Sequence, residues 1–163
     1  GVRHFFVAKI GEAQYDTLQE AIDKADNGAT IVLLRDITVT STVKFDKAAT
    51  GRYLAIEVSS NQSGKALSAI AEVYVQDAQG QRISRDAWKT KYADSEDDNG
   101  NHTGDKAFDL QESTYWQTEN GAALPHLLVI DLGQQQTVTA LEYLPRAEQG
   151  APGSIKDCKV FVY

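Results

Sequence analysis

The residues that could hold a metal ion or act as acids are most concentrated in the run Asp94-Ser95-Glu96-Asp97-Asp98. Such a group of carboxylates could bind Ca²⁺, which prefers oxygen ligands, although the spacing of an EF-hand loop is absent. More often, a run of this kind is a solvated acidic surface. The three histidines, His4, His102 and His126, are scattered along the chain and indicate neither a zinc site nor a catalytic triad.

Nucleophilic chemistry has few candidates in this chain. Cys158 is the single cysteine, so no internal disulfide can form. It lies in the alternating run 158–163, where a small hydrophobic side chain would pack, and no partner that would activate its thiol can be identified. Acidic pairs are plentiful, as a hydrolase would need, but no nucleophile elbow or histidine cluster accompanies them. The sequence therefore predicts a protein that is not an enzyme.

The charge balance restricts the partners that the chain could bind. The 163 residues carry a net charge of −7, and the lysines and arginines are spread singly. Nucleic acid binding needs cations gathered on one face, so this class is excluded. No apolar run is long enough to insert into a membrane. With 42% hydrophobic residues, the chain can bury the core of one large domain, or of one domain with a small appendage.

The amino-terminal part alternates between strand and helix patterns. Residues 5–10 predict a short strand, and a helix capped by Asp16 or Thr17 comes next. The apolar run 29–34 predicts a strand buried on both faces, and residues 36–45 predict another strand. This pattern resembles the entry unit of bacterial right-handed β-helix surface proteins. Such a unit cannot bury its faces alone, so we expect it to dock on the β-rich remainder of the chain.

The rest of the chain has an almost entirely β pattern. Strands are expected at residues 52–58, 70–75, 127–132, 138–144 and 155–163. The polar stretch 93–126 predicts a long functional or metal-organised loop region. We therefore expect a mostly β fold, a jelly-roll β-sandwich over residues 43–163, preceded by a small α/β element over residues 1–42.

Several motifs in the β-rich part resemble those of discoidin, or coagulation-factor type C, domains. Residues 107–118 (AFDLQESTYWQT) resemble the AxDGxxxTxWxT segment of that family. Further matches are residues 125–133 (PHLLVIDLG), 143–146 (YLPR), 153–157 (GSIKD), 51–54 (GRYL) and 68–73 (SAIAEV). Among these domains, the resemblance is to the bacterial carbohydrate-binding modules of family 32.

The order of these motifs departs from the family pattern. The segments at residues 51–54 and 68–73 normally close the domain, whereas here they precede the other motifs. The chain is either the tail of one module joined to the head of the next, or one circularly permuted module. We favour a single closed domain, because half a sandwich would leave strand edges and core exposed. Residues 1–42 would then supply or cover what the missing middle of the pattern provides.

The resemblance implies one structural Ca²⁺ beneath the loops that face the ligand. At the matched positions its ligands would be the carboxylates of Asp109 and Glu72, Thr114, and the carbonyls of Ala107 and Gln111. The glycine that comes after the aspartate in the family is Leu110 here, so the turn is expected to differ. Alternatively, Asp109 merely caps a turn.

The resemblance also implies a sugar site at the loop tips. The chain keeps Glu96 and Arg146 at matching positions, but it has Gln117 in place of a histidine and Asn120 in place of a stacking tryptophan. An amide can still bond to a sugar hydroxyl, whereas Asn120 offers no stacking surface. Arg146 could also form an ion pair within the fold, with Glu96 or Asp157.

The resemblance implies two alternative functions. The first is a non-catalytic carbohydrate-binding module that recognises a terminal sugar such as galactose or an N-acetylhexosamine. It would serve a secreted or surface bacterial protein, for example as an accessory domain of a glycoside hydrolase, in an extracellular, cell-surface or periplasmic location. The alternative is a spacer or protein-interaction domain with a decayed sugar site that contacts neighbouring domains. Trp88 and Trp116 are expected to be core anchors rather than sugar platforms.

Overall fold

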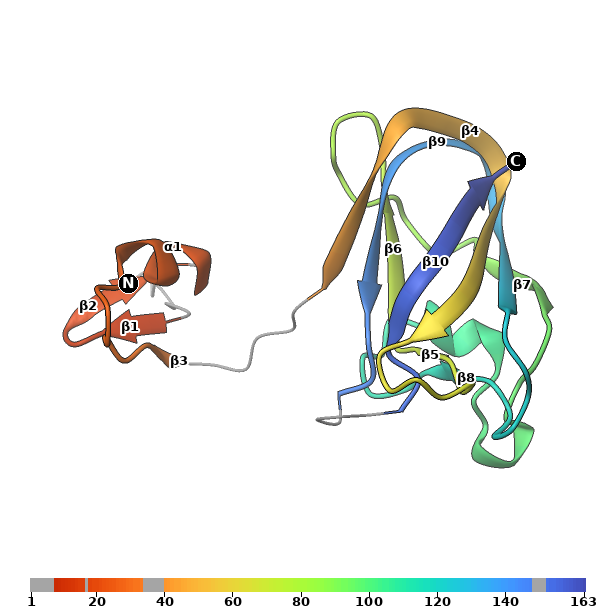
Figure 1. Cartoon of the computed structure of the whole chain (residues 1–163). Coiled ribbons are helices and arrows are strands. Elements are labelled where there is room, and N and C mark those ends of the chain that lie inside the picture. The colour runs from red at the N-terminus through yellow and green to blue at the C-terminus, as the bar shows by residue number, and fades with distance from the viewer. Residues whose placement is uncertain (1–7, 17, 34–39, 148–151) are drawn as a thin grey trace. The chain divides into compact units, whose positions relative to one another are not determined.

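The computed structural model describes residues 8–16, 18–33, 40–147 and 152–163. The chain divides into two compact units, Gly1–Val39 and Thr40–Tyr163 (Figure 1). The boundary was expected between residues 42 and 43. That position falls inside the first strand of the second unit, because this strand begins at Ser41.

The first unit is a small α/β element, as the sequence predicts. Its elements are β1 (Ala8–Ile10), β2 (Ala13–Tyr15), α1 (Leu18–Lys24) and β3 (Val32–Leu33), and its antiparallel sheet has the order β2-β1-β3. The expectation that residues 29–34 form a strand buried on both faces is wrong for β3, because Val32 and Leu33 are 41% and 53% exposed. Among the residues of this unit that the structure describes, α1 is the one helix, and its seven residues do not cover both faces of a sheet. Residues 5–7, Thr17 and 34–39 lie outside the described residues.

The second unit is built almost wholly from antiparallel strands. They are β4 (Ser41–Asn61), β5 (Ala69–Ile70), β6 (Glu72–Gln76), β7 (Lys89–Ala93), β8 (Trp116–Gln117), β9 (His126–Leu144) and β10 (Ile155–Val162). Two 3-10 helices, η1 (Asp98–Gly100) and η2 (Gly104–Ala107), lie in the region between β7 and β8. The main sheet has the order β10-β4-β9-β6, with β7 also paired to β9, and β5 pairs with β8. The predicted mostly β sandwich is confirmed.

Two long strands, β4 and β9, create both layers of the sandwich. They pair along almost their whole length and bend over together at one end (Figure 1). Beyond the bend, the second half of β4 pairs with β10, and the first half of β9 pairs with β7, which makes the first layer. The other halves of β4 and β9, together with β6, make the second layer. The two strands expected at residues 127–132 and 138–144 are thus one strand.

The bend brings the end of the chain against the backbone of β4. The amides of Arg52 and Tyr53 both donate to the carbonyl of Tyr163, at 2.8 Å each. A Cβ atom at Gly51 would lie 2.5 Å from the Tyr163 backbone, so only glycine fits at this position. This contact explains why the glycine of the GRYL segment stands where the strand turns between layers.

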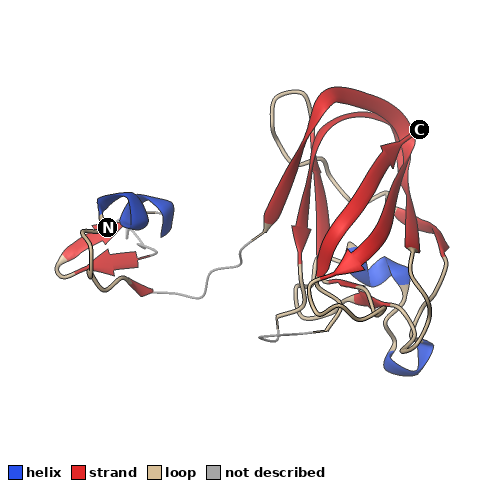
Figure 2. Ribbon diagram, viewed as in Figure 1, coloured by secondary structure: helices blue, strands red, loops and turns tan. Residues whose placement is uncertain are grey.

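The core lies between the two layers and reflects the alternation of the strands. Leu54 and Ile56 of β4 face the core together with their cross-strand partners Ile130 and Leu128 of β9. The two tryptophans, Trp88 and Trp116, also lie in this core, with 5% and 0% exposure respectively. The expectation that they are core anchors is confirmed. Figure 2 shows that the 3-10 helices and the long loops gather at the end of the sandwich opposite the bend.

Candidate functional site

Glu72 is a fully buried carboxylate at the start of β6. Because Val73 and Val75 point into the core, the alternation of the strand places Glu72 on the outer side of the second layer. Burial raises the pKa of Glu72 to about 7, against the opposing effect of the nearby Arg85 guanidinium. A neighbouring carboxylate, Asp109, raises this pKa further. A group in this position needs a cation or several donors beside it.

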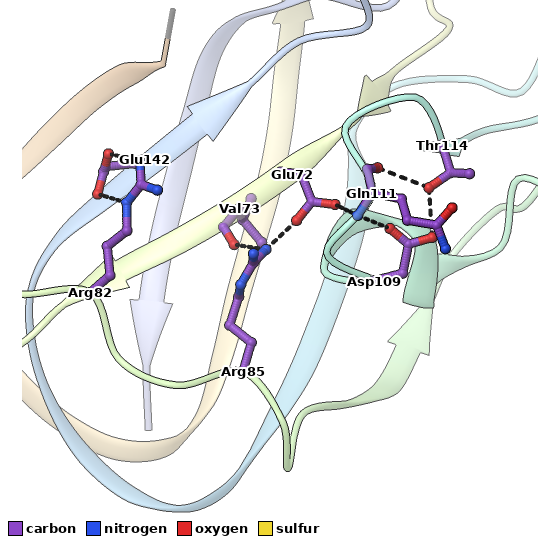
Figure 3. Close-up of polar contacts among 8 residues, drawn as sticks. All are labelled: Glu72, Val73, Arg82, Arg85, Asp109, Gln111, Thr114 and Glu142. Atoms are coloured by element: carbon purple, nitrogen blue, oxygen red, sulfur yellow. Dashed lines mark hydrogen bonds and ion pairs between the residues drawn. The ribbon is translucent and has the colours of Figure 1, made fainter. Parts of the chain in front are cut away.

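Arg85 supplies a cation on one side of Glu72. Its Nη1 atom forms an ion pair with Glu72 Oε2 and donates to the carbonyl of Val73 at 3.1 Å (Figure 3). The Arg85 side chain is only 8% exposed, and its guanidinium lies 4.1 Å from the ring centre of Tyr74. The position of this arginine is therefore fixed by packing as well as by charge.

The loop from Asp109 to Thr114 approaches Glu72 from the other side (Figure 3). The amide of Gln111 lies 3.1 Å from Glu72 Oε1 and also 3.1 Å from Asp109 Oδ1. The hydroxyl of Thr114 lies 2.6 Å from Asp109 Oδ2 and 3.0 Å from the carbonyl oxygen of Gln111. Leu110 adopts a left-handed conformation, φ 66°, so a turn of the kind that favours glycine forms here with leucine.

These contacts bring the expected metal ligands into one place. Gln111 contacts both Glu72 and Asp109, and Thr114 contacts both Asp109 and Gln111. Ala107, the buried last residue of η2, stands two residues before Asp109. Carboxylate, hydroxyl and carbonyl oxygens form a donor set that fits a hard cation such as Ca²⁺. Within the described residues, no group of three or more His, Cys, Asp or Glu side chains could hold a metal. A cation here would depend on hydroxyl and main-chain oxygens as well.

The same contacts show that two stretches far apart in the chain belong to one body. Glu72 lies 39 residues before Gln111, and β5 and β8 pair close by, with Ile70 opposite Trp116. The segments that resemble the end and the beginning of a discoidin domain thus pack together in a single unit.

A second cluster lies around Gln117 at the end of β8. Arg146 Nη1 donates to Gln117 Oε1 at 2.7 Å, and the Arg146 guanidinium lies 4.2 Å from the ring centre of Tyr115. The ring of His102 stacks on Tyr115 with 4.1 Å between ring centres, and Gln117 Nε2 lies 3.4 Å from Asp97 Oδ2. An amide, a cation and two aromatic rings therefore share one half-buried loop surface.

The other two expected sugar ligands have different surroundings. Glu96 Oε1 accepts a hydrogen bond from the amide of Gly104 at 2.7 Å, which holds the start of η2. Asn120 is exposed in the turn after β8. Asp157, considered as an alternative partner of Arg146, accepts a hydrogen bond from the hydroxyl of Ser60.

Sequence reasoning missed three residues of the second cluster. Asp97 was considered only as part of the acidic run, and Tyr115 lies at a variable position of the segment 107–118. The histidines looked scattered because His102 reaches Tyr115 only through the fold. One signal was present, since Tyr115 and Gln117 are two residues apart and therefore share a face of an extended segment.

Comparison with known proteins agrees with the motifs and the fold. No curated protein matches the chain. Residues 90–163 match the family model of the F5/8 type C domain. The matched stretch runs from β7 to β10 and contains most residues of both clusters.

Domains of this family are binding modules for carbohydrate or protein, generally without catalytic activity, and typically extracellular or at the cell surface. No helix in the described part of the chain is both long and apolar enough to cross a membrane. The resemblance expected from the motifs is confirmed over residues 90–163, where the chain matches the F5/8 type C, or discoidin, domain model.

Proposed function

We propose that this chain is a non-catalytic carbohydrate-binding module that recognises a terminal sugar, such as galactose or an N-acetylhexosamine. The supporting observation is the contact among Arg146, Gln117 and Tyr115 on the loop surface opposite the bend. We also propose that the parent protein is a secreted or surface bacterial protein that acts on glycans.

The chemistry of this cluster suits a sugar. Arg146 and Gln117 offer N–H donors and an amide oxygen for hydroxyl groups, and Tyr115 brings aromatic surface close to them. Asn120 cannot stack on a sugar ring. The Tyr115 ring is already covered by His102 at 4.1 Å and by the Arg146 guanidinium at 4.2 Å, so a sugar would contact the edge of Tyr115 and not its face. Glu96 and Asn120 would lie at the rim. A shallow site of this kind binds weakly, and several copies in one assembly would raise the overall avidity.

Replacing Arg146 with alanine is expected to weaken sugar binding about 10- to 100-fold, because charged hydrogen bonds to the ligand are lost. Calorimetric titration with galactose, N-acetylhexosamines and fucose measures this change. The Gln117→Ala variant should also weaken binding, whereas the exposed Lys65→Ala variant should bind as the original chain does. If the original chain binds none of these sugars, the proposed function is wrong.

A spacer or protein-interaction domain is the second candidate. It is supported by the substitutions at Gln117 and Asn120, and by the hydrogen bond with which Arg146 and Gln117 satisfy each other. In this case a glycan array stays silent, while the chain binds a neighbouring domain of its parent protein.

We further propose that a structural Ca²⁺ binds at Glu72, Asp109, Thr114 and the carbonyls of Ala107 and Gln111. A cation that binds only the folded state raises the melting temperature. Thermal melting with CaCl₂ and with EDTA is therefore expected to show a higher midpoint with calcium. The Asp109→Ala variant should lose this difference, whereas Asp98→Ala, in the exposed part of the acidic run, should keep it. Equal midpoints for the original chain would refute the calcium proposal and leave the fold unaffected.

A further inference from the structure

The outer face of the first layer carries four aromatic side chains, Tyr53, Tyr92, Phe161 and Tyr163. Leu54 and Ile56 of β4 and their partners on β9 and β10 point into the core, so the alternate residues point outward. Tyr92, Phe161 and Tyr163 are exposed by 53%, 48% and 61%, respectively. Exposed aromatic patches on a sheet commonly mark interaction surfaces. We call these four residues and the side chains between them the aromatic face.

The aromatic face has a regular cross-strand geometry. Phe161 on β10 lies opposite Ala55, Ala55 lies opposite Val129, and Val129 lies opposite Tyr92 on β7. Because neighbouring strands are about 4.8 Å apart, this row spans about 14 Å from Phe161 to Tyr92. Ala55 and Val129 are each 5% exposed, so the two aromatic rings at the ends of the row are accessible while the small aliphatic side chains between them are buried. In the next row, the rings of Tyr53 and Tyr163 lie 5.5 Å apart.

Cations surround these rings although the chain as a whole is acidic, with a net charge of −7. Arg52 and Lys91 each lie 5.8 Å from the ring centre of Tyr53. Lys89 stands opposite Asp131, and Lys159 stands opposite Glu57. Asp131 is already held by Arg52 at 2.8 Å. The aromatic face therefore carries more cations than carboxylates.

The aromatic rings and the positive charge together indicate the class of partner that fits the aromatic face. A second copy of the chain is disfavoured, because a symmetric contact would bring the same cations together. A uronic acid polysaccharide matches both features, since its pyranose rings stack on aromatic side chains and its carboxylates pair with lysine and arginine. We propose that the aromatic face is a second binding surface, which holds an extended anionic polysaccharide across β10, β4, β9 and β7. It is separate from the terminal-sugar site at Gln117 and Arg146.

The test uses the full chain and three soluble polymers: polygalacturonate, neutral galactan and polyglutamate. Affinity gel electrophoresis and calorimetry are expected to show binding to polygalacturonate that weakens with added salt, because exposed charge pairs are screened. The Tyr92→Ala/Phe161→Ala variant should lose about tenfold in affinity through the loss of two stacking surfaces. The Lys91→Glu/Lys159→Glu variant should lose at least as much. Lys44→Glu/Lys47→Glu is the matched control, because both lysines are exposed on β4 outside the aromatic face.

The outcomes separate this proposal from the proposed function. Selective binding of polygalacturonate that survives in the Arg146→Ala variant supports the aromatic face, whatever the result with monosaccharides. Equal binding of galactan would refute the role of the cations. Equal binding of polyglutamate would refute the role of the aromatic rings, because charge alone would then explain binding, and would overturn the polysaccharide as the partner. Absence of polygalacturonate binding, or unchanged binding in both face variants, would overturn the proposal. Circular dichroism of each variant checks that the fold is retained.

Discussion

Replacing Arg85 with methionine is expected to destabilise the second unit by about 3–5 kcal/mol, because it leaves a buried carboxylate without its cation. Glu72 is fully buried, and the Arg85 side chain is 8% exposed. Methionine keeps much of the packing against Tyr74 but removes the charge. Urea denaturation at pH 8 measures the change in the free energy of unfolding.

The pH dependence and a double variant identify the cause. Burial raises the pKa of Glu72 to about 7 in the folded chain, above its value of 4.5 in the unfolded chain. Between these two values the folded state binds the proton more tightly, so the free energy of unfolding falls as the pH rises towards 7. The penalty of Arg85→Met should therefore shrink at pH 5, where folded Glu72 is protonated. The Glu72→Gln/Arg85→Met variant should recover most of the loss, since glutamine still accepts the bond from the Gln111 amide. A full loss that persists in the double variant, at both pH values, would show that packing and not charge is responsible.

Replacing Trp116 with alanine is expected to destabilise the same unit by about 3–5 kcal/mol through the cavity left in the core. Trp116 is fully buried, and its indole Nε1 donates to the carbonyl of Ser95 at 3.0 Å. It also pairs with Ile70, so its loss affects both β5 and β8. Thermal or urea denaturation measures the effect.

The Trp116→Phe variant separates the core role from a sugar-binding role. Phenylalanine keeps most of the buried surface and loses the bond to Ser95, so a cost of about 1 kcal/mol is expected. Because Trp116 faces the core and Gln117 faces the loop surface, this variant should bind sugar as the original chain does. Loss of sugar binding with little change in stability would instead make Trp116 part of the ligand site.

The sequence was sufficient for the fold class, most strands and the contact between Glu72 and the Asp109 loop. Alternation identified the segments that became β4, β6, β9 and β10, because a half-buried strand repeats every two residues. It could not show that β9 is continuous, because the polar residues from Gly133 to Gln136 resemble a turn, whereas in the structure they carry the strand over the bend.

The two clusters differ in how far they could be anticipated. The Glu72 site was expected from matched motifs, but its ion pair with Arg85 was not, because Arg85 lies in an irregular segment whose path is set by tertiary packing. The contact of His102 with Tyr115 depends likewise on η1 and the loop after it. The strand 29–34 was expected to be buried since apolar runs usually are, yet burial requires a covering element, which local sequence does not reveal.

The shared strands have a consequence for how the sandwich assembles. The partners Val58 and His126 are 68 residues apart, and Ser41 and Tyr143 are 102 residues apart, so large loops must close before either layer gains its central pair. Neither layer can form independently of the other, because β4 and β9 each run through both layers. A fragment starting at residue 90 would retain the family-matched sequence but lose the inner neighbour of both β9 and β10. Cooperative collapse of the whole unit, rather than stepwise addition of sheets, is the folding behaviour that this connectivity imposes.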